Sequence, residues 1–519
     1  MNKKFFKDSS FIIFATIALL YAIGNFIWWK LNTPIIPTGI SALHFNDIFK
    51  NDVLYYNAPL IVWIMKGMFF IFGKQYFDLQ IIGVNYVFFL VAIYFIYKLG
   101  LELKDKETGK VAMVLFALTP AVYYMGRHYG HQDWHVMVAM IVNIYCLIKL
   151  DDFKNSKWSI LYGMTVGLGL LIKDEFLPYF FAPWLYVVVR SLVNTVETRK
   201  VLNILVTIVI GALISGCHYF RYEIINKVLH EPIIETAPIF SLTSLSVTTV
   251  DLSKYLLYPL LFFVFAVGFV LFLYKNKNRD KNIYILWFAV PWTIITFMPH
   301  VKAPEYCLGF IPCMILICSF FITSIKNIKK ILVLSLIVVI YLAQYVFLIY
   351  VNDISSFNKN VYGIRSISEK SYCQGRYKMN FCFKLSQYVD NYSVTKKVLF
   401  DDTYMQKSTG IDRFFFEAMN NIYFSRTNVY DYKTRGNYDC DILFTTKNGI
   451  FTRDNQEIAL KEYKRYINSP LLTEESKRIY INKRMEEIEQ LKNFIKNNFI
   501  LIDNIPYKDD VIEVYRLVK

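Results

Sequence analysis

Apolar runs long enough to cross a lipid bilayer recur through the first two thirds of this chain. A transmembrane helix needs roughly 20 apolar residues, and eleven stretches between residues 10 and 351 approach that length. The composition agrees, because 55% of the residues are apolar and only 19% are charged, against about 25% charged residues in soluble domains. The sequence therefore predicts a polytopic α-helical membrane protein and excludes a water-soluble enzyme, a disordered chain and a collagen-like chain.

The expected spans are poor in charge and are separated by polar segments. They lie at 10–29, 78–97, 110–126, 134–150, 158–173, 176–192, 200–219, 255–274, 282–299, 305–324 and 331–351. A further apolar run, 59–73, is shorter and contains Lys66, so we expect a re-entrant or juxtamembrane helix there. We expect the first span to stay uncleaved, because no small-residue cleavage site follows it.

The positive charges of the chain indicate its orientation. The formal net charge is +16, and 20 of the 57 Lys and Arg residues lie before the first span, at span ends or between spans on the same side as the N-terminus. Loops that face the cytoplasm carry such an excess. We therefore expect a protein of the cytoplasmic (inner) membrane with its N-terminus in the cytoplasm.

Residues 352–519 differ in character from the transmembrane domain expected at 1–351. Charged residues become dense, and short β-like runs at 397–400, 441–444, 499–502 and 511–515 accompany a helical stretch at 474–497. This pattern predicts a C-terminal soluble α/β domain. After eleven spans it lies outside the cytoplasm, in the periplasm. Its mild excess of basic residues does not indicate nucleic-acid binding. Cys373 and Cys382 are candidates for a disulfide there, although spacing alone does not fix a pairing.

Ionisable residues gather at the ends of spans on the outer side. Because such groups are costly near a membrane, they mark a functional site by default. The alternative for each is a charge at a helix end that reaches into water, and we read the Asp151-Asp152 pair on the opposite side as such a solvated turn. The candidates are His44, Asp47, Asp52, Arg127, His131, Asp133, His135, Lys173, Glu175, Arg221, Lys302 and Glu305.

These residue types suit group transfer at a phosphate-bearing lipid. Arg and Lys neutralise phosphates, and a carboxylate, or a His held by one, removes the proton of an acceptor as general base. Asp133 and His131 are candidate ligands of a divalent metal ion that screens a phosphate leaving group. No organic cofactor is expected.

Several stretches resemble a family, the polyprenyl-phosphate-sugar-dependent glycosyltransferases of the GT-C class. Within it they are closest to family 39, with the protein O-mannosyltransferases and the lipid A aminoarabinose transferases. The stretches keep the family's order over about 300 residues. They are Asn57–Trp63 with Phe70–Gly73, Tyr123–Arg127 with Gln132-Asp133, Gly167–Lys173, His300–Tyr306 with Pro312, and Ile512–Leu517.

The resemblance implies roles for particular residues. Asp133 matches a loop aspartate near the donor phosphate and metal, and Arg127, Lys173 and Lys302 match positions that meet the lipid phosphate. From its place on the outer side alone, we expect Arg221 to meet the phosphate as well. The first outer loop departs from the family, which has Asp-Glu a few residues before a His or Tyr. Ile40-Ser41 stand there when the sequences are aligned on His44-Phe45.

Asp47 is the nearest substitute for the missing catalytic aspartate. It follows His44 by three residues, so the two share a face if the segment is helical. Asp52 is the second choice. The alternative is a divergent member with altered or lost activity.

The sequence thus predicts an integral-membrane glycosyltransferase. The donor would be a polyprenyl-phosphate-linked sugar and the acceptor lipid A, another envelope glycolipid or a protein, on the outer face of the membrane. The alternatives are a transporter or flippase, which predicts inverted repeats and broken helices at mid-membrane, and a catalytically inactive scaffold for envelope assembly. The partners expected are the donor, the acceptor and membrane lipids, without nucleic acid. The sequence does not identify the sugar, the acceptor or the metal.

Overall fold

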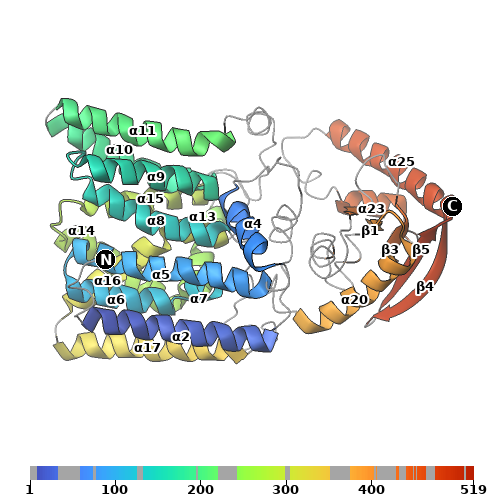
Figure 1. Cartoon of the computed structure of the whole chain (residues 1–519), viewed down its shortest axis with the longest axis horizontal. Coiled ribbons are helices and arrows are strands. Elements are labelled where there is room, and N and C mark those ends of the chain that lie inside the picture. The colour runs from blue at the N-terminus through green and yellow to red at the C-terminus, as the bar shows by residue number, and fades with distance from the viewer. Residues whose placement is uncertain are drawn as a thin grey trace. The chain divides into compact units, whose positions relative to one another are not determined.

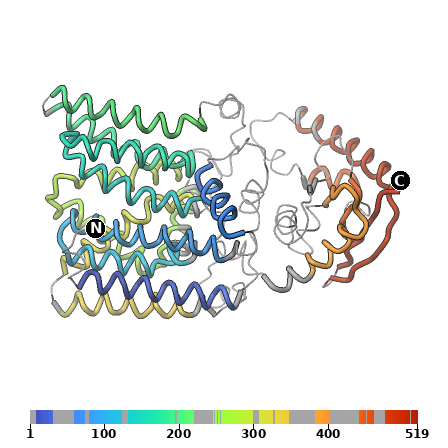
Figure 2. The backbone as a smooth tube through the Cα atoms, in the orientation of Figure 1, coloured from blue at the N-terminus to red at the C-terminus, as the bar shows by residue number. Residues whose placement is uncertain are grey.

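The computed structural model describes two compact units, one ending at Tyr350 and the other beginning at Gly375 (Figures 1 and 2). The described residues are 9–32, 59–73, 77–125, 132–194, 197–219, 242–297, 304–325, 327–350, 375–401, 428–431, 440–447, 453–462, 474–507 and 510–518, with single positions at 405, 416, 449 and 451. The domain boundary expected at 351/352 lies outside these ranges, as does Cys373, so the boundary and the disulfide stay predictions.

The first unit is a bundle of membrane helices, and each of the eleven expected spans falls on a helix or a pair of helices. Among the described residues, seven helices are long and apolar enough to cross a membrane. The helices of the bundle are α2 (Ser9–Asn32), α5 (Phe77–Leu103), α6 (Lys106–Leu118), α7 (Pro120–Met125), α8 (Gln132–Lys149), α9 (Ser156–Ile172), α10 (Phe176–Asn194), α11 (Thr198–Tyr219), α14 (Tyr258–Lys275), α15 (Lys281–Phe297), α16 (Ile311–Ser324) and α17 (Asn327–Tyr350). The predicted polytopic helical fold is confirmed.

Shorter elements join or cover these helices. The run at 59–73 forms α4 (Leu60–Phe72), which is too short to span a bilayer and is inclined to α5 and α9 near one end of the bundle (Figure 1). The span expected at 110–126 is divided between α6 and α7 at Thr119, because Pro120 cannot continue the α6 hydrogen-bond ladder. The other short elements are α13 (Leu242–Val250), the π-helix η2 (Asp251–Leu256) and the 3₁₀-helix η3 (Pro304–Phe310).

Glycines bring α9 and α11 into close contact. A Cβ atom at Gly167 would lie 2.6 Å from Cβ of Ile214, and one at Gly163 would lie 2.9 Å from the carbonyl oxygen of Thr207. Small residues allow this approach between membrane helices. These two glycines of α9 therefore serve helix packing.

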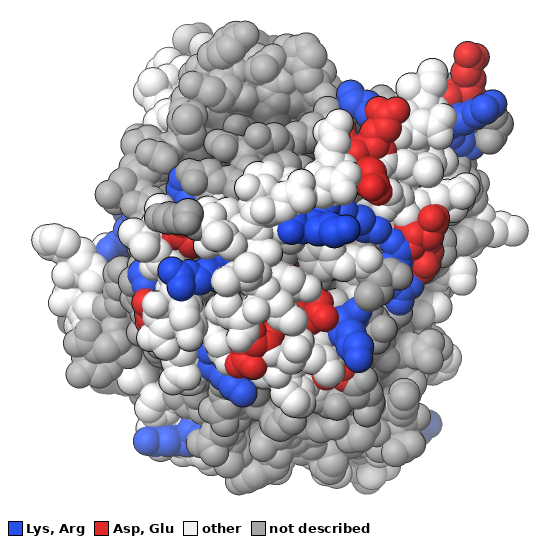
Figure 3. Space-filling model, turned by 90° about the vertical axis from the view of Figure 1, so that its right-hand side faces the viewer, with Lys and Arg blue, Asp and Glu red and all other residues white. Residues whose placement is uncertain are grey.

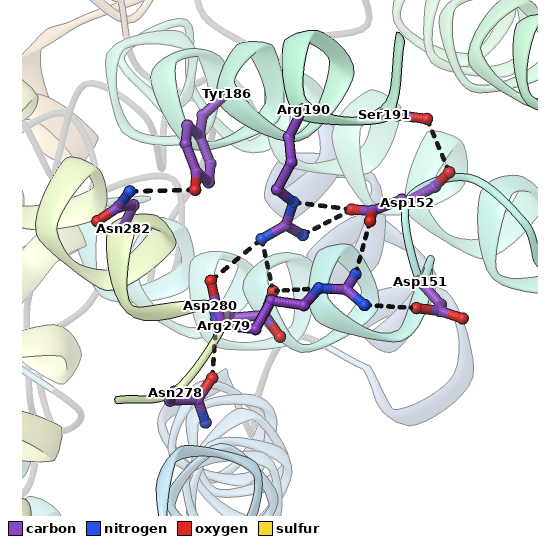
Figure 4. A network of polar contacts seen from close by, with 9 residues as sticks. All are labelled: Asp151, Asp152, Tyr186, Arg190, Ser191, Asn278, Arg279, Asp280 and Asn282. Atoms are coloured by element: carbon purple, nitrogen blue, oxygen red, sulfur yellow. Dashed lines mark hydrogen bonds and ion pairs between the residues drawn. The ribbon is translucent and has the colours of Figure 1, made fainter. Parts of the chain in front are cut away.

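A network of charged side chains ties together the turns at one end of the bundle (Figure 4). Arg190 on α10 lies 2.7 Å from Asp152 and 2.9 Å from Asp280. Arg279 lies 2.9 Å from Asp152 and 3.0 Å from Asp151. The reading of Asp151-Asp152 as a solvated turn is wrong for Asp152, whose carboxylate is buried between two guanidinium groups.

The turn that carries these aspartates is strained. Asp151, Asp152 and Phe153 all have positive φ angles, of 46°, 54° and 61°. The left-handed conformation costs roughly 1–2 kcal/mol per residue outside glycine, although Asp tolerates it better than Phe. The Phe153 side chain is fully buried and its carbonyl accepts a hydrogen bond from Asn203. Burial and ion pairing therefore hold a backbone shape that the residues do not favour.

We predict that Asp152→Asn destabilises the bundle far more than Asp151→Asn. Removing Asp152 leaves the partly buried Arg190 with one partner fewer, which costs on the order of 3 kcal/mol. The Asp151–Arg279 pair is more than half exposed and contributes about 0–1 kcal/mol. Titration of the purified variants with denaturing detergent measures both free energies of unfolding. Equal losses in the two variants would contradict this account.

The second unit is built on a five-stranded sheet with the order β2-β1-β3-β5-β4. Strand β1 pairs in parallel with β2 and β3, whereas β5 pairs antiparallel with β3 and β4. The strands are β1 (Lys397–Phe400), β2 (Asn428–Asp431), β3 (Ile442–Thr446), β4 (Phe499–Tyr507) and β5 (Asp510–Leu517). The four strands and the helix predicted here are confirmed.

Helices cover both faces of the sheet. Val398 and Phe400 pack with residues of α20 (Gly375–Tyr392), whereas Leu399 packs with residues of α23 (Asn455–Glu462) and α25 (Glu474–Asn498). This alternation follows from the two-residue period of a strand. On the face in Figure 3, acidic and basic side chains are interspersed.

Candidate active site

A buried ion pair joins the facing ends of two neighbouring membrane helices. Asp133 lies in the first turn of α8, and Lys173 follows the last residue of α9. The Lys173 ammonium donates to both Asp133 carboxylate oxygens, at 2.9 and 3.1 Å. The side chains are only 16% and 10% exposed, respectively. The structure thus brings together two residues that are 40 positions apart in the sequence.

The helix ends favour these charges where they stand. The N-terminus of a helix carries a partial positive charge and favours an anion such as Asp133, and the C-terminus favours a cation such as Lys173. Because α8 and α9 run in opposite directions, the two ends meet on one side. The pair is therefore stabilised by the helices as well as by its own attraction.

Glu175 completes a cluster around the Lys173 ammonium. Its Oε1 atom lies 3.2 Å from Lys173 Nζ. Its Oε2 atom is buried and has no hydrogen-bond partner among the residues that the structure describes. We call Asp133, Lys173 and Glu175 the charged cluster.

The electrostatics of this cluster follow from burial. Burial lowers the pKa of Lys173, but the carboxylates of Asp133 and Glu175 outweigh it and the net pKa lies above its ordinary value. Burial raises the pKa of Glu175 to about 8 against the attraction of Lys173, even though 39% of the Glu175 side chain is exposed. Burial therefore favours the neutral form of the Glu175 carboxyl, although Lys173 lies beside it.

An aromatic wall holds the Lys173 side chain from another side. Lys173 Nζ lies 4.8 Å from the ring centroid of Tyr306 in η3, a cation–π distance. The Tyr179 hydroxyl donates to the carbonyl of Tyr306, and Tyr179 packs against Gly309 so closely that a Cβ there would lie 2.5 Å from its ring. Tyr179 had no signal in the sequence, because its partner is 127 residues away.

Comparison with known proteins identifies the fold. Residues 56–219, which contain the charged cluster, match the protein-family model described as dolichyl-phosphate-mannose-protein mannosyltransferase. The crystal structure of ArnT from Cupriavidus metallidurans bound to undecaprenyl phosphate is similar, with a TM-score of 0.57 and 11% sequence identity over 97% of this chain and 97% of that chain. The apo oligosaccharyltransferase from Archaeoglobus fulgidus has a TM-score of 0.57 and 11% identity over 90% of this chain and 71% of that chain. No curated protein matches the sequence.

The chain has the GT-C fold. The resemblance read from the sequence is confirmed. The prediction of a multi-pass membrane protein is confirmed as well.

The structure brings some of the predicted site residues together, places others apart and does not describe the rest. It brings Asp133, Lys173 and Glu175 together. His135 lies two residues after Asp133, on another side of α8, where its ring packs edge-on against Phe88 of α5 at 4.6 Å. Glu305 belongs to η3, next to Tyr306, although its side chain is not described. The remaining candidates lie outside the described residues: His44, Asp47, Asp52, Arg127, His131, Arg221 and Lys302.

The described residues supply one of the two expected metal ligands. Asp133 is present, but Lys173 lies between its carboxylate and that of Glu175. Within the described ranges no three His, Cys, Asp or Glu side chains are grouped as a metal site. The metal site at Asp133 and His131 stays a prediction, and we derive no step through it.

We predict that Glu175 makes the stability of the protein depend on pH. A carboxyl whose pKa is raised from 4.5 to about 8 on folding stabilises the folded state most at low pH, and this contribution is lost as the pH rises towards 8. The apparent melting temperature of the wild type should therefore fall more steeply between pH 5 and pH 8 than that of Glu175→Gln. Parallel curves for the two proteins in thermal unfolding at several pH values would show that Glu175 titrates normally.

Proposed function

We propose that this protein is a membrane glycosyltransferase that moves a sugar from a polyprenyl-phosphate donor to an acceptor in the cell envelope. The observation that carries the proposal is the buried Lys173–Asp133 pair, placed at the ends of two membrane helices within the segment that matches a mannosyltransferase family. Buried charges at membrane depth are costly and are kept mainly for function. The GT-C fold supports a transferase over a transporter.

The donor class is inferred from a structural relative. The similar ArnT structure is bound to undecaprenyl phosphate, which is a polyprenyl phosphate. In this chain the lipid carrier would lie in the membrane with its phosphate at the end of the bundle that holds the charged cluster. We place this end at the outer face of the cytoplasmic membrane, following the charge asymmetry of the loops.

The reaction that we propose is an in-line displacement at the sugar carbon. The acceptor oxygen or nitrogen forms a bond to this carbon, the bond from carbon to phosphate oxygen breaks, and the acceptor proton passes to a base. The lipid phosphate leaves with the electron pair. A carboxylate near the reacting atoms suffices as the base, and cations stabilise the charge that develops on the phosphate.

The charged cluster divides these roles among its residues. Lys173 is already neutralised by Asp133, so we assign the pair to orienting the donor and place most of the phosphate charge on Arg127, Arg221 and Lys302. Asp47, oriented by His44, remains the expected base. The structure adds Glu175 as a second candidate, because its Oε2 atom adjoins the pair and has no hydrogen-bond partner among the described residues.

The first test is mass spectrometry of envelope glycolipids and glycoproteins from cells with and without the gene. A sugar-modified species that disappears with the gene and returns with the wild-type copy identifies the product. If the product profile stays unchanged under conditions where the protein is abundant in the membrane, the scaffold reading replaces the transferase.

We predict that exchanging the two charges separates structure from catalysis. Asp133→Asn alone leaves a buried Lys173 with one partner fewer, so its loss of activity could reflect misfolding. The double variant Asp133→Lys with Lys173→Asp keeps an ion pair in the same place but reverses it. It should remain folded in a thermal unfolding assay, with a lower melting temperature because each charge now stands at the helix end that disfavours it, and it should lose activity by about 100-fold or more. Full activity in the double variant would show that the pair is only structural.

A further inference from the structure

An apolar groove opens on the bundle between α9, α10 and α11. It has a volume of about 470 Å³, within the usual range of ligand sites. One wall comes from α10, with Leu177 and Phe181, and the opposite wall from α11, with Ile208 and Ala212. Leu177, Phe181 and Ile208 remain 46–48% exposed, so the described protein leaves the groove uncovered.

The packing of the helices explains why the groove exists. Gly163, Gly167 and Gly211 draw α9 and α11 together, while α10 presents large aromatic side chains such as Trp184 to the same groove. The hydroxyl groups of Thr207 and Ser215 donate to carbonyls of their own helix. The long walls therefore offer mainly hydrocarbon and aromatic surface to an occupant.

Such walls select the chemistry of an occupant. A peptide would leave backbone N–H and C=O groups without partners beside them, which is costly within a membrane. A hydrocarbon chain has no such groups. The groove runs along α11 from Thr207 to Tyr219, which is about 18 Å at 1.5 Å per residue. This length suits one lipid chain.

The polar end of the groove carries an acid. Asp174 is the only ionisable Asp, Glu, Lys or Arg residue among those that line it, and it stands between Lys173 and Glu175 in the sequence. The groove therefore ends beside the charged cluster. A carboxylate repels the phosphate of a lipid carrier and attracts a hydroxyl or amine that donates a hydrogen bond.

We propose that this groove holds the hydrocarbon chain of the acceptor, and that the acceptor is a lipid whose headgroup presents a hydroxyl or amine to Asp174. The inference rests on the proposed function and adds the class of acceptor: a membrane lipid enters sideways between α10 and α11, and a protein does not. The donor phosphate lies elsewhere in the site, near the predicted basic residues.

Photocrosslinking with matched lipids tests the groove without an activity assay. The full-length protein is placed in phosphatidylcholine nanodiscs with a diazirine-bearing diacylglycerol or with the phosphatidate that has the same chains. The two probes differ only in the phosphate. We expect crosslinks at Leu177, Phe181 and Ile208, and a preference for diacylglycerol of about five-fold, the ratio set by one like charge at close range in a polar medium.

Paired substitutions locate the probe. Ala212→Trp fills the groove and should abolish these crosslinks, whereas Leu213→Trp, on the neighbouring outward residue that is 73% exposed, should leave them. Ile208→Trp and Val209→Trp form a second pair of the same kind, in case one variant does not fold. Asp174→Asn should remove the preference between headgroups.

Other results would overturn the proposal. Uniform crosslinking around the bundle, unaffected by Ala212→Trp, would show that the groove holds only bulk lipid. A preference for phosphatidate would assign the groove to the donor. If the charge-exchanged Asp133/Lys173 variant is inactive while Ala212→Trp retains full transfer in cells, the glycosyltransferase stands and the acceptor groove fails.

Discussion

The attraction between Lys173 and Asp133 organises the end of the bundle where we place the active site. Two opposite charges can be buried at membrane depth only if they face each other. The beginning of α8 and the end of α9 must therefore lie at the same level. The α9–α10 link then follows directly, and η3 closes over the Lys173 side chain through Tyr306. Each of these elements is positioned by a contact to the pair or to a residue that touches it.

The other end of the bundle also contains charged side chains in contact with one another, but in a different arrangement. There the chain accepts unfavourable backbone angles at Asp151, Asp152 and Phe153, and two arginines from distant segments hold the turn. That network is structural: each of its charged side chains forms an ion pair with another member. The cluster at Lys173 instead keeps a carboxylate oxygen of Glu175 without a described partner. The contrast between a closed and an open set of charges is what marks the second as a site for chemistry.

The sequence predicted the membrane helices because hydropathy is a local property, and it predicted most strands of the C-terminal unit for the same reason. It also singled out Asp133 and Lys173, since a charge at the end of an apolar run is visible without a structure. It missed the partnership of Asp152 with Arg190, and the positioning of Tyr306 by Tyr179. These depend on residues far apart in the sequence. Strand β2 was missed because Asn428–Asp431 is short and has polar residues at both ends.

The link between α9 and α10 has no spare length. Lys173 points to Asp133, Asp174 lines the groove and Glu175 turns back to Lys173, after which α10 begins at Phe176. Three adjacent side chains therefore point in three different directions, and no other residue separates them. Exchange of one side chain for a similar one changes one direction only. Insertion or deletion of a single residue would turn all of them at once, so the length of this link is a fixed dimension of the fold, in a position where loops usually vary freely.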